Sequence, residues 1–577
     1  MLLTLAIFLP LLAALIVVCL PAKYKLAIKV VSLIGVSLCL YVTLHIAAAF
    51  YSHEPQETME QLFAKKIATS VSQLKPEQQT CLANVLAARN FTYPAKMVPL
   101  TAEEQTSLNQ LGLATTYRQV LELKLAAAAP QAKHLILTEH YAWIPSFGIH
   151  YCVAVDGLSL TLIFLTALLG VLCIIYSWNY EKGTKGFFGL FLTLVSSLMG
   201  VFLALDFFLF YVFWEVVLLP MYFLIGIWGG PRRIYAAIKF FIYTLIGSVL
   251  MLLAMLALYF YAEPNSFNVM ALTTMAPGFA LNFQWWIFLA LFIGFAIKVP
   301  VFPFHTWLPD AHVEAPTPVS VILAGVLLKM GGYGLFRFSY PLAPLAGIEP
   351  CFVWMVAILG VINIVYGAFC AMAQKDFKSL VAYSSISHMG YVLLGISAFT
   401  YASVQGAALQ MFNHGLSSAL MFLIVGVVYD RAHHRRIDDF GGIGIQMPYY
   451  TGLAMVGFFA SLGLPGLNGF ISEIMVFLGV YQGFSVAPHT SKMILLYISL
   501  SGIVFTAVYI LWTVQRVYMG EIKEKYKEFS DISCREVLAM LPLALLCIVV
   551  GVYPKIIIDV LQPAANVVVD MLKLLPK

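Results

Sequence analysis

The sequence predicts an all-α polytopic membrane protein with about 14 transmembrane helices, arranged as two inverted repeats that each contain a broken helix. Of the 577 residues, 61% are hydrophobic and only 11% are charged, whereas a soluble chain of this size carries about 25% charged residues. The apolar residues gather in runs of about 20, the length that a helix needs to cross a bilayer. The net charge of +5 is small and dispersed, so nucleic-acid binding is not expected.

The first apolar run, MLLTLAIFLPLLAALIVVCL, has no positive residue before it and no small-residue cleavage site. It therefore predicts a retained helix rather than a signal peptide. The other runs follow it along the chain. The predicted spans lie near residues 2–20, 27–50, 157–178, 187–204, 206–228, 236–260, 284–304, 318–338, 351–373, 378–399, 403–429, 450–481, 493–516 and 536–555.

Basic loops predict the orientation of these spans. If every run crosses once, the following loops fall on one side: PAKYK, NYEKGTK, GGPRRIYAAIK, QKDFK, RAHHRR and GEIKEKYKE. Because Lys and Arg accumulate in cytoplasmic loops, this side is predicted to be the inner one. Both termini then lie outside.

A polar segment interrupts the spans. Residues 51–142 are predicted to be an outer-side insertion between a first helix pair at 1–50 and a transmembrane domain at 143–577. Composition leaves open whether the insertion is a small helical cap or only partly ordered. Cys81 and Cys152 could be bridged on the outer side, although free thiols are the default.

No cofactor motif is present in the sequence. The nine cysteines are scattered without a C-x-x-C pair, and there is no P-loop or G-x-G-x-x-G after a strand. We therefore expect neither a metal nor a cofactor in this chain.

Weak internal repetition relates the two halves. FWEVVLLPMYFLIG (213–226) resembles FNHGLSSALMFLIVG (412–426), which places Glu215 opposite His414. Helices interrupted by Pro and Gly, around KVPVFP and GLPGLNGFISE, stand at comparable places in the halves. Paired broken helices of this kind point to the ion site of a transporter.

Ionisable residues lie near the middle of several predicted spans. Each charge at the bilayer centre costs roughly 2.5–3.5 kcal/mol, so such residues are expected to face the bundle interior and to pair or contact trapped water. They are Glu215, Lys298, Lys329, His388, His414 and Glu473.

Lys298 is the most informative of them because Pro300 follows it. Proline has no N–H and crowds the preceding turn, which frees backbone carbonyls. Freed carbonyls at membrane depth are tolerated only against protein or a water-lined cavity. Lys298 is therefore predicted to line a hydrated pocket, and its charge state would depend on how closely Glu215 approaches. The two residues are predicted to form a proton switch.

Structural alternatives exist for each residue. Lys298, Lys329 and Glu215 could form fixed buried ion pairs, and polar neighbours could hold Glu473. Asp206, at a helix start, is expected to be an N-cap.

Each of the remaining candidates could take part in proton transfer or have only a structural role. His388 and His414 could be neutral histidines hydrogen-bonded to a neighbouring helix. Lys239, at the inner end of its helix, could extend to the membrane surface. His305 and Asp310 could line a path for proton uptake or only shape the turn that holds them.

Four long stretches carry a family resemblance. FWEVVLLPMYFLIGIWGG, KVPVFPFHTWLPDAHVEAPTPVSVILAGVLLKMGGYG, FKSLVAYSSISHMGYVLLG and GLPGLNGFISEIMVF resemble the antiporter-like, proton-translocating subunits of respiratory complex I, the NADH–quinone oxidoreductase. The resemblance covers about 1–50 and 143–577. VEAPTPVSVILAGVLLKMGGYG, Glu473 where relatives typically have lysine, and the lack of a long lateral helix favour the branch of subunit M, the counterpart of mitochondrial subunit 4.

The resemblance implies a function in coupling quinone reduction elsewhere in the complex to proton movement. It implies that Glu215 and Lys298 form the switch, and that Lys329 and His388 form the central relay. His414 would extend this relay. The outlet group would be Glu473.

The same resemblance implies the setting. NADH, FMN, iron–sulfur clusters and quinone are expected in partner subunits, with the antiporter-like subunits L and N as neighbours in a bacterial inner membrane. Both termini and residues 51–142 would be periplasmic. This insertion is longer than the family's usual loop, and the resemblance assigns it no role.

Two functional alternatives remain open: a subunit of an Mrp-type cation/proton antiporter, and the membrane subunit of a related hydrogenase complex. Glu473 in place of lysine speaks against the first. The electron donor of the partner would separate the second. A purely structural scaffold fits the helix count but not the buried charges.

Overall fold

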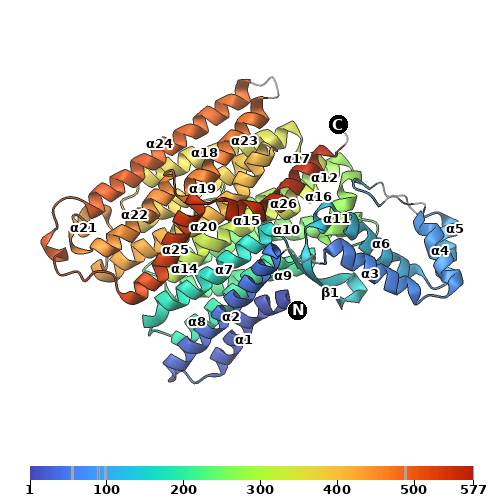
Figure 1. The fold of residues 1–577 in the computed structure, drawn as a ribbon, viewed down its shortest axis with the longest axis horizontal. Coiled ribbons are helices and arrows are strands. Elements are labelled where there is room, and N and C mark those ends of the chain that lie inside the picture. The colour runs from blue at the N-terminus through green and yellow to red at the C-terminus, as the bar shows by residue number, and fades with distance from the viewer. Residues whose placement is uncertain (53–56, 88, 90, 96–99, 486–489, 576–577) are drawn as a thin grey trace.

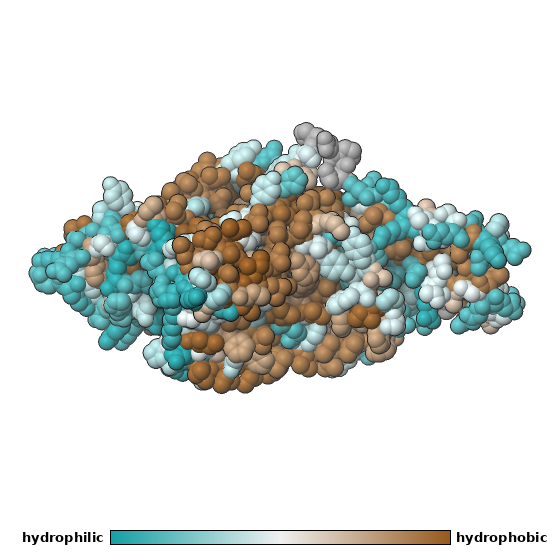
Figure 2. Space-filling model, turned by 90° about the horizontal axis from the view of Figure 1, so that it is seen from below, coloured by the Kyte–Doolittle hydropathy of each residue, from teal (hydrophilic) through white to brown (hydrophobic). Residues whose placement is uncertain are grey.

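The computed structural model describes the whole chain apart from residues 53–56, 88, 90, 96–99, 486–489 and 576–577. Long helices lie side by side in one bundle (Figure 1). Seen from below, the molecule has a broad apolar middle between two hydrophilic ends (Figure 2). One end carries the basic loops, and the other carries the insertion and both chain termini (Figure 1). These are called the basic-loop side and the insertion side.

Among the described residues, 13 helical segments are long and apolar enough to cross a membrane, and the predicted fold class is confirmed. One segment, Thr317–Leu342, contains α14 (Thr317–Ile322), α15 (Leu328–Gly334) and α16 (Tyr340–Leu342). The others are α1 (Leu2–Cys19), α2 (Lys25–Tyr51), α7 (Gly157–Tyr176), α8 (Thr184–Leu203), α9 (Phe207–Trp228), α10 (Arg233–Tyr261), α12 (Leu281–Lys298), α18 (Pro350–Met372), α19 (Phe377–Ser397), α20 (Tyr401–Ala432), α24 (Thr490–Tyr518) and α25 (Cys534–Val552).

The predicted span at 450–481 is divided into α22 (Pro448–Leu462) and α23 (Asn468–Ser485). Gly463 ends α22 with a φ of +81°, a left-handed conformation that favours glycine. Asn413 of α20 closes this break, because its side-chain amide donates to the carbonyl of Asn468 at 2.7 Å and Asn468 donates back at 3.1 Å. A neighbouring helix thus satisfies the interrupted backbone.

The other broken helix is α12, which stops at Lys298 and resumes as α13 (Trp307–Glu314). The indole N–H of Trp307 donates to the carbonyl of Ile297 at 2.9 Å. Asn363 of α18 donates to the carbonyl of Pro300 at 3.2 Å and accepts from a backbone N–H beyond it. The carbonyls freed by the proline therefore meet protein side chains, one of the two environments that the sequence predicts.

The insertion is helical in its described part. It contains α3 (Met59–Ser72), α4 (Pro76–Ala87), α5 (Ala102–Gln110) and α6 (Ala114–Ala128), at the right of Figure 1. An antiparallel hairpin, not predicted from the sequence, follows it: β1 (Ile136–Ile144) pairs with β2 (Ile149–Val155). Because β1 runs across residue 142, the predicted domain boundary falls inside a strand. Cys81 and Cys152 are both free thiols.

The last helix, α26 (Lys555–Lys573), was also not predicted from the sequence. It packs against α7 and α20, and one of its faces is polar, so it gives no transmembrane signal. The insertion holds its end, since Tyr93 and Gln131 donate to the carbonyl and the sulfur of Met571 at 3.4 and 2.7 Å. The insertion thereby ties the C-terminal helix to the bundle.

Glu122 of α6 makes the attachment of the insertion pH-dependent. Its carboxylate is buried, accepts from Ser266 at 2.8 Å and lies 3.7 Å from His150. Burial raises its pKa from 4.5 to about 8. The folded chain therefore binds this proton more tightly than the unfolded chain, and the stabilisation is lost as the pH rises through about 8.

We therefore expect hydrogen exchange in α6 to accelerate between pH 6 and pH 9 in membrane-embedded protein, after correction for the intrinsic effect of pH on exchange. Glu122→Gln should abolish this acceleration, because the amide stays neutral. Glu77→Gln, on α4, serves as the control at a second glutamate of the insertion. Equal pH responses in all three proteins would contradict the assignment.

Candidate functional site

Lys298 is buried and Glu215 is half-buried, and the two are not joined by the ion pair that the sequence suggests. The Nζ of Lys298 has no hydrogen-bond partner among the described residues; it lies over the rings of Trp214 and Phe240, at 5.5 and 5.2 Å from their centroids. Glu215 follows Trp214 on α9, and its Oε1 is buried and also unpartnered. No ion pair within 4.0 Å joins the two in the described structure. Aromatic faces, rather than a carboxylate, contact the ammonium group.

A fixed buried ion pair looks different elsewhere in this chain. Arg337 donates to the carboxylate of Asp156, and both side chains are at most 4% exposed. Asp156 also caps α7 by accepting from the N–H of Ser159 at 2.9 Å. Such a pair satisfies both charges and joins two elements permanently. Lys298 lacks this arrangement, because no carboxylate lies within ion-pair distance of its buried Nζ among the described residues.

A row of four ionisable side chains lies inside the bundle, with one step, between His414 and His388, that no direct hydrogen bond spans among the described residues. The Nζ of Lys329 donates to the carbonyl of Ala324 and lies 2.8 Å from Nδ1 of His414. The ring of His388 comes next, with its centroid 5.5 Å from that of the His414 ring. Nδ1 of His388 then lies 3.4 Å from Oε1 of Glu473. Four residues from four helical segments are thus brought together.

Local backbone geometry positions the two ends of this row. Wide π-helical turns at Leu323–Leu327 and Leu335–Ser339 flank α15, the segment that carries Lys329, and such turns occur frequently at functional sites. At the other end, a Cβ on Gly463 would lie 2.8 Å from the carboxylate of Glu473. The break between α22 and α23 therefore makes room for the last group of the row.

The remaining predicted residues lie at both ends of the bundle: Lys239, Asp310 and His305 toward the basic-loop side, and Asp206 beside the hairpin, where it accepts from the N–H of His150 at 3.0 Å. Lys239 forms an ion pair with Asp310 at 2.7 Å, beside a pocket of about 240 Å³ that Tyr383 also lines. His305 is buried, and neither of its ring nitrogens has a partner among the described residues. Asp206 caps α9 by accepting from two backbone N–H groups, as expected. No hydrogen bond joins Lys239 or His305 to Lys298 in the described structure.

Two further buried basic residues were missed. His312 of α13 is fully buried, stacks on Phe422 at 4.4 Å, and has no partner on either nitrogen among the described residues. Lys378, at the start of α19, donates to the carbonyl of Ala315 and lines a pocket of about 160 Å³. His312 is in a short helix that hydropathy assigns to a loop, and Lys378 stands at the very start of a predicted span, where a lysine is expected to reach the membrane surface. A helical spacing of seven residues from His305 to His312 was the available signal.

Comparisons with known proteins identify the family of this chain. A sequence profile of the family described as NADH:quinone oxidoreductase/Mrp antiporter, transmembrane, matches residues 204–531. The chain is 45% identical over 427 residues to NADH-quinone oxidoreductase subunit M of Rickettsia conorii, covering 73% of this chain and 84% of the relative. It is 44% identical over 481 residues to subunit M of Rhodobacter capsulatus, covering 82% and 89%.

Solved structures show the same fold. A chain of respiratory complex I from Thermus thermophilus with bound NADH superposes with a TM-score of 0.77 at 25% identity, covering 99% of this chain and 100% of that chain. A chain of the Mrp complex from Dietzia sp. DQ12-45-1b gives a TM-score of 0.66 at 23% identity, covering 87% of this chain and 52% of that chain. The second likeness concerns the fold alone.

Proposed function

The chain belongs to the NADH:quinone oxidoreductase/Mrp antiporter family, and we propose that it is the proton-translocating membrane subunit M of an NADH-quinone oxidoreductase. The relatives from Rickettsia conorii and Rhodobacter capsulatus, which are matched over 84% and 89% of their own length, carry this name. The complex I chain is also matched over its full length, whereas only 52% of the Mrp chain is matched. An Mrp-type antiporter subunit is therefore the weaker candidate.

The observation that carries the proposal is the row from Lys329 to Glu473. When Lys329 gives a proton to Nδ1 of His414, a proton can leave from Nε2 of the same ring, as in any imidazole relay. His388 receives it and passes a proton from Nδ1 to the carboxylate of Glu473, 3.4 Å away. Each transfer leaves the donor ready for the next proton. The row thus conducts protons without any redox change.

Lys298 and Glu215 would determine when Lys329 gives its proton to His414. A cation on Lys298 repels a second cation on Lys329 across the low-dielectric interior, and a close Glu215 weakens this repulsion. A change in the distance between Glu215 and Lys298 would thereby drive the proton of Lys329 toward His414. The absence of an ion pair between the two supports this role: among the described residues, Nζ of Lys298 has no hydrogen-bond partner, while Glu215 contacts the Tyr211 hydroxyl and still lies near enough to act on the charge of Lys298.

The electron-transfer groups are assigned to other subunits. NADH, FMN, iron–sulfur clusters and quinone would be held there, with the antiporter-like subunits L and N as the neighbours of this chain in the bilayer. Both termini and the insertion would face the periplasm, because the basic loops lie at the opposite end of the bundle.

Purification from membranes tests the assignment. A tag on this chain should recover NADH-oxidising peripheral subunits, and the preparation should reduce quinone with NADH. When the preparation is placed in sealed vesicles, NADH oxidation should move protons across the membrane and acidify the compartment that receives them. Recovery of only antiporter-like subunits, with Na⁺/H⁺ exchange and no NADH oxidation, would favour the Mrp-type alternative instead.

A further inference from the structure

A groove of about 800 Å³ opens on the basic-loop side of the molecule. The helices α2 and α25 both pack against α7, and residues of all three line the groove. Its apolar part is formed by Leu33, Ile175 and Leu538. Its polar part is formed by the C-terminal end of α20 and the segment that begins α25. The groove therefore runs from a charged helix border into the apolar surface of the bundle.

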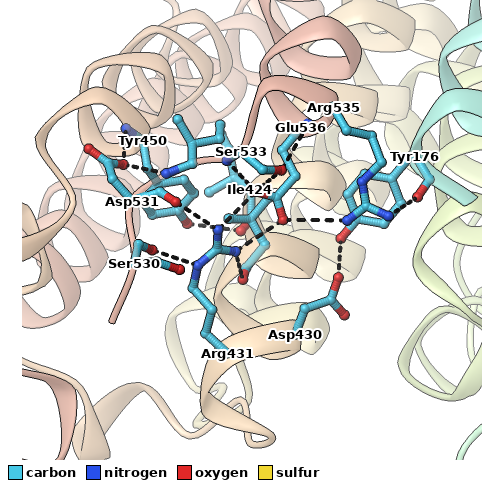
Figure 3. Close-up of polar contacts among 12 residues, drawn as sticks. Tyr176, Ile424, Asp430, Arg431, Tyr450, Ser530, Asp531, Ser533, Arg535 and Glu536 are labelled. Atoms are coloured by element: carbon cyan, nitrogen blue, oxygen red, sulfur yellow. Dashed lines mark hydrogen bonds and ion pairs between the residues drawn. The ribbon is translucent and has the colours of Figure 1, made fainter. Parts of the chain in front are cut away.

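Arg431, one of the charges at this border, is already satisfied. It makes two bonds to Glu536, at 3.1 and 2.8 Å, and donates to the carbonyls of Ser530 and Asp531 (Figure 3). Both partners are mostly buried, and the pair joins α20 to α25. Arg431 therefore has little capacity left for a ligand.

Arg535 and Asp430 differ from this pair. They lie on two sides of Tyr176, whose hydroxyl donates to Asp430 at 2.9 Å and whose carbonyl accepts from Arg535 at 3.3 Å (Figure 3). Arg535 is 25% exposed and has one distant contact to Glu536, at 3.8 Å. Asp430 is exposed and has no ion pair among the described residues. A cation and an anion, each with unused bonding capacity, thus flank Tyr176 at the polar border of the groove.

We propose that this groove binds a phospholipid with an amine headgroup of the phosphatidylethanolamine class. The guanidinium of Arg535 offers a planar set of donors for the phosphate, and the carboxylate of Asp430 accepts from the ammonium group. The acyl chains follow Leu33 and Leu538. A lipid with an anionic headgroup and no amine would place its charge beside Asp430 without compensation, and a choline headgroup has no N–H to donate.

The apolar surface continues in the direction that the acyl chains require. Leu538 and Leu545 are two helical turns apart on α25, and their side chains are 55% and 51% exposed. Ile34 of α2 is also about half exposed. Trp178, with an apolar ring and a polar N–H, lies in the groove lining, as is common at the membrane–water interface.

A photo-crosslinking amino acid placed at Leu538 tests the proposal directly. The protein is purified with all subunits that accompany it and is reconstituted in vesicles of equal parts phosphatidylethanolamine, phosphatidylglycerol and phosphatidylcholine. The same crosslinker at Ile242 of α10 is the matched control, because this residue is similarly exposed, at 49%, and lies on a helix that does not line the groove. Mass spectrometry then identifies the adducts.

We expect the ratio of phosphatidylethanolamine to phosphatidylglycerol adducts to be about tenfold higher at Leu538 than at Ile242, the factor that one charge-assisted contact supplies. Asp430→Asn should remove this preference, and Arg535→Gln should lower the phospholipid adducts at Leu538 by a similar factor. Lys527→Gln, on the same side of the molecule, should change neither.

Equal lipid composition at both positions, or adducts at Leu538 that are protein rather than lipid, would overturn the proposal. Leu538→Trp gives a second test that leaves the charges in place. The larger indole should occupy part of the groove, so the amount of phosphatidylethanolamine that is retained on purification should fall. Because Leu538 is exposed, the complex should still assemble. Unchanged retention in this variant would also contradict the site.

Discussion

Replacing Lys298 by alanine is expected to lower NADH oxidation and proton pumping together, each by at least about tenfold, or ~1.4 kcal/mol in the barrier. The reason is that Lys298 is buried and unpartnered, so its charge is the variable element of the proposed switch. Without it, the proton on Lys329 has no cation to repel it toward His414. Both rates are measured in vesicles after native gels show an assembled complex.

Three further variants make this result interpretable. Lys298→Met preserves most of the side-chain volume and separates loss of charge from the cavity that alanine leaves. Glu215→Gln should reduce pumping as well, because it removes the group proposed to set the state of Lys298. Lys23→Ala, at an exposed position, is the control and should behave as the unchanged protein. Normal pumping with normal NADH oxidation in Lys298→Met would leave Lys298 as a structural charge.

The second large effect is expected at the two ends of the central row. Lys329→Met and Glu473→Gln should each stop coupled pumping, because each removes one end of a single path. Residues that act as one unit have strongly non-additive effects. The double variant should therefore be no slower than the slower single variant. Pumping and NADH oxidation are again recorded in sealed vesicles.

An additive result would mean that Lys329 and Glu473 serve separate paths. Ser461 provides a finer control, because its hydroxyl lies 3.1 Å from Nε2 of His388, off the line to Glu473. Ser461→Ala should leave pumping within about twofold, the effect of losing one neutral hydrogen bond. A loss as large as that of Glu473→Gln would place the path through Ser461 instead.

The helices of this protein could be predicted because transmembrane segments are a local property. About 20 apolar residues suffice to define each span, and the predicted starts and ends fall close to those of the helices, as at α7 and α20. The interruption after Lys298 was predictable for the same reason, since proline acts on its own turn. The hairpin and α26 were missed because neither is a long apolar run.

The sequence by itself determined that Glu215, Lys298, Lys329, His388 and Glu473 lie inside spans, since hydropathy places them there whatever their partners. The burial of His312 and Lys378 emerged only from the structure. Their roles stay predictions. Only the tertiary structure decided the pairings: Lys329 meets His414, which is 85 residues away in the chain, while Lys298 and Glu215 stay apart. The physical reason is that burial follows from the residues within one helix, whereas a partner is chosen by the packing of helices that are distant in sequence.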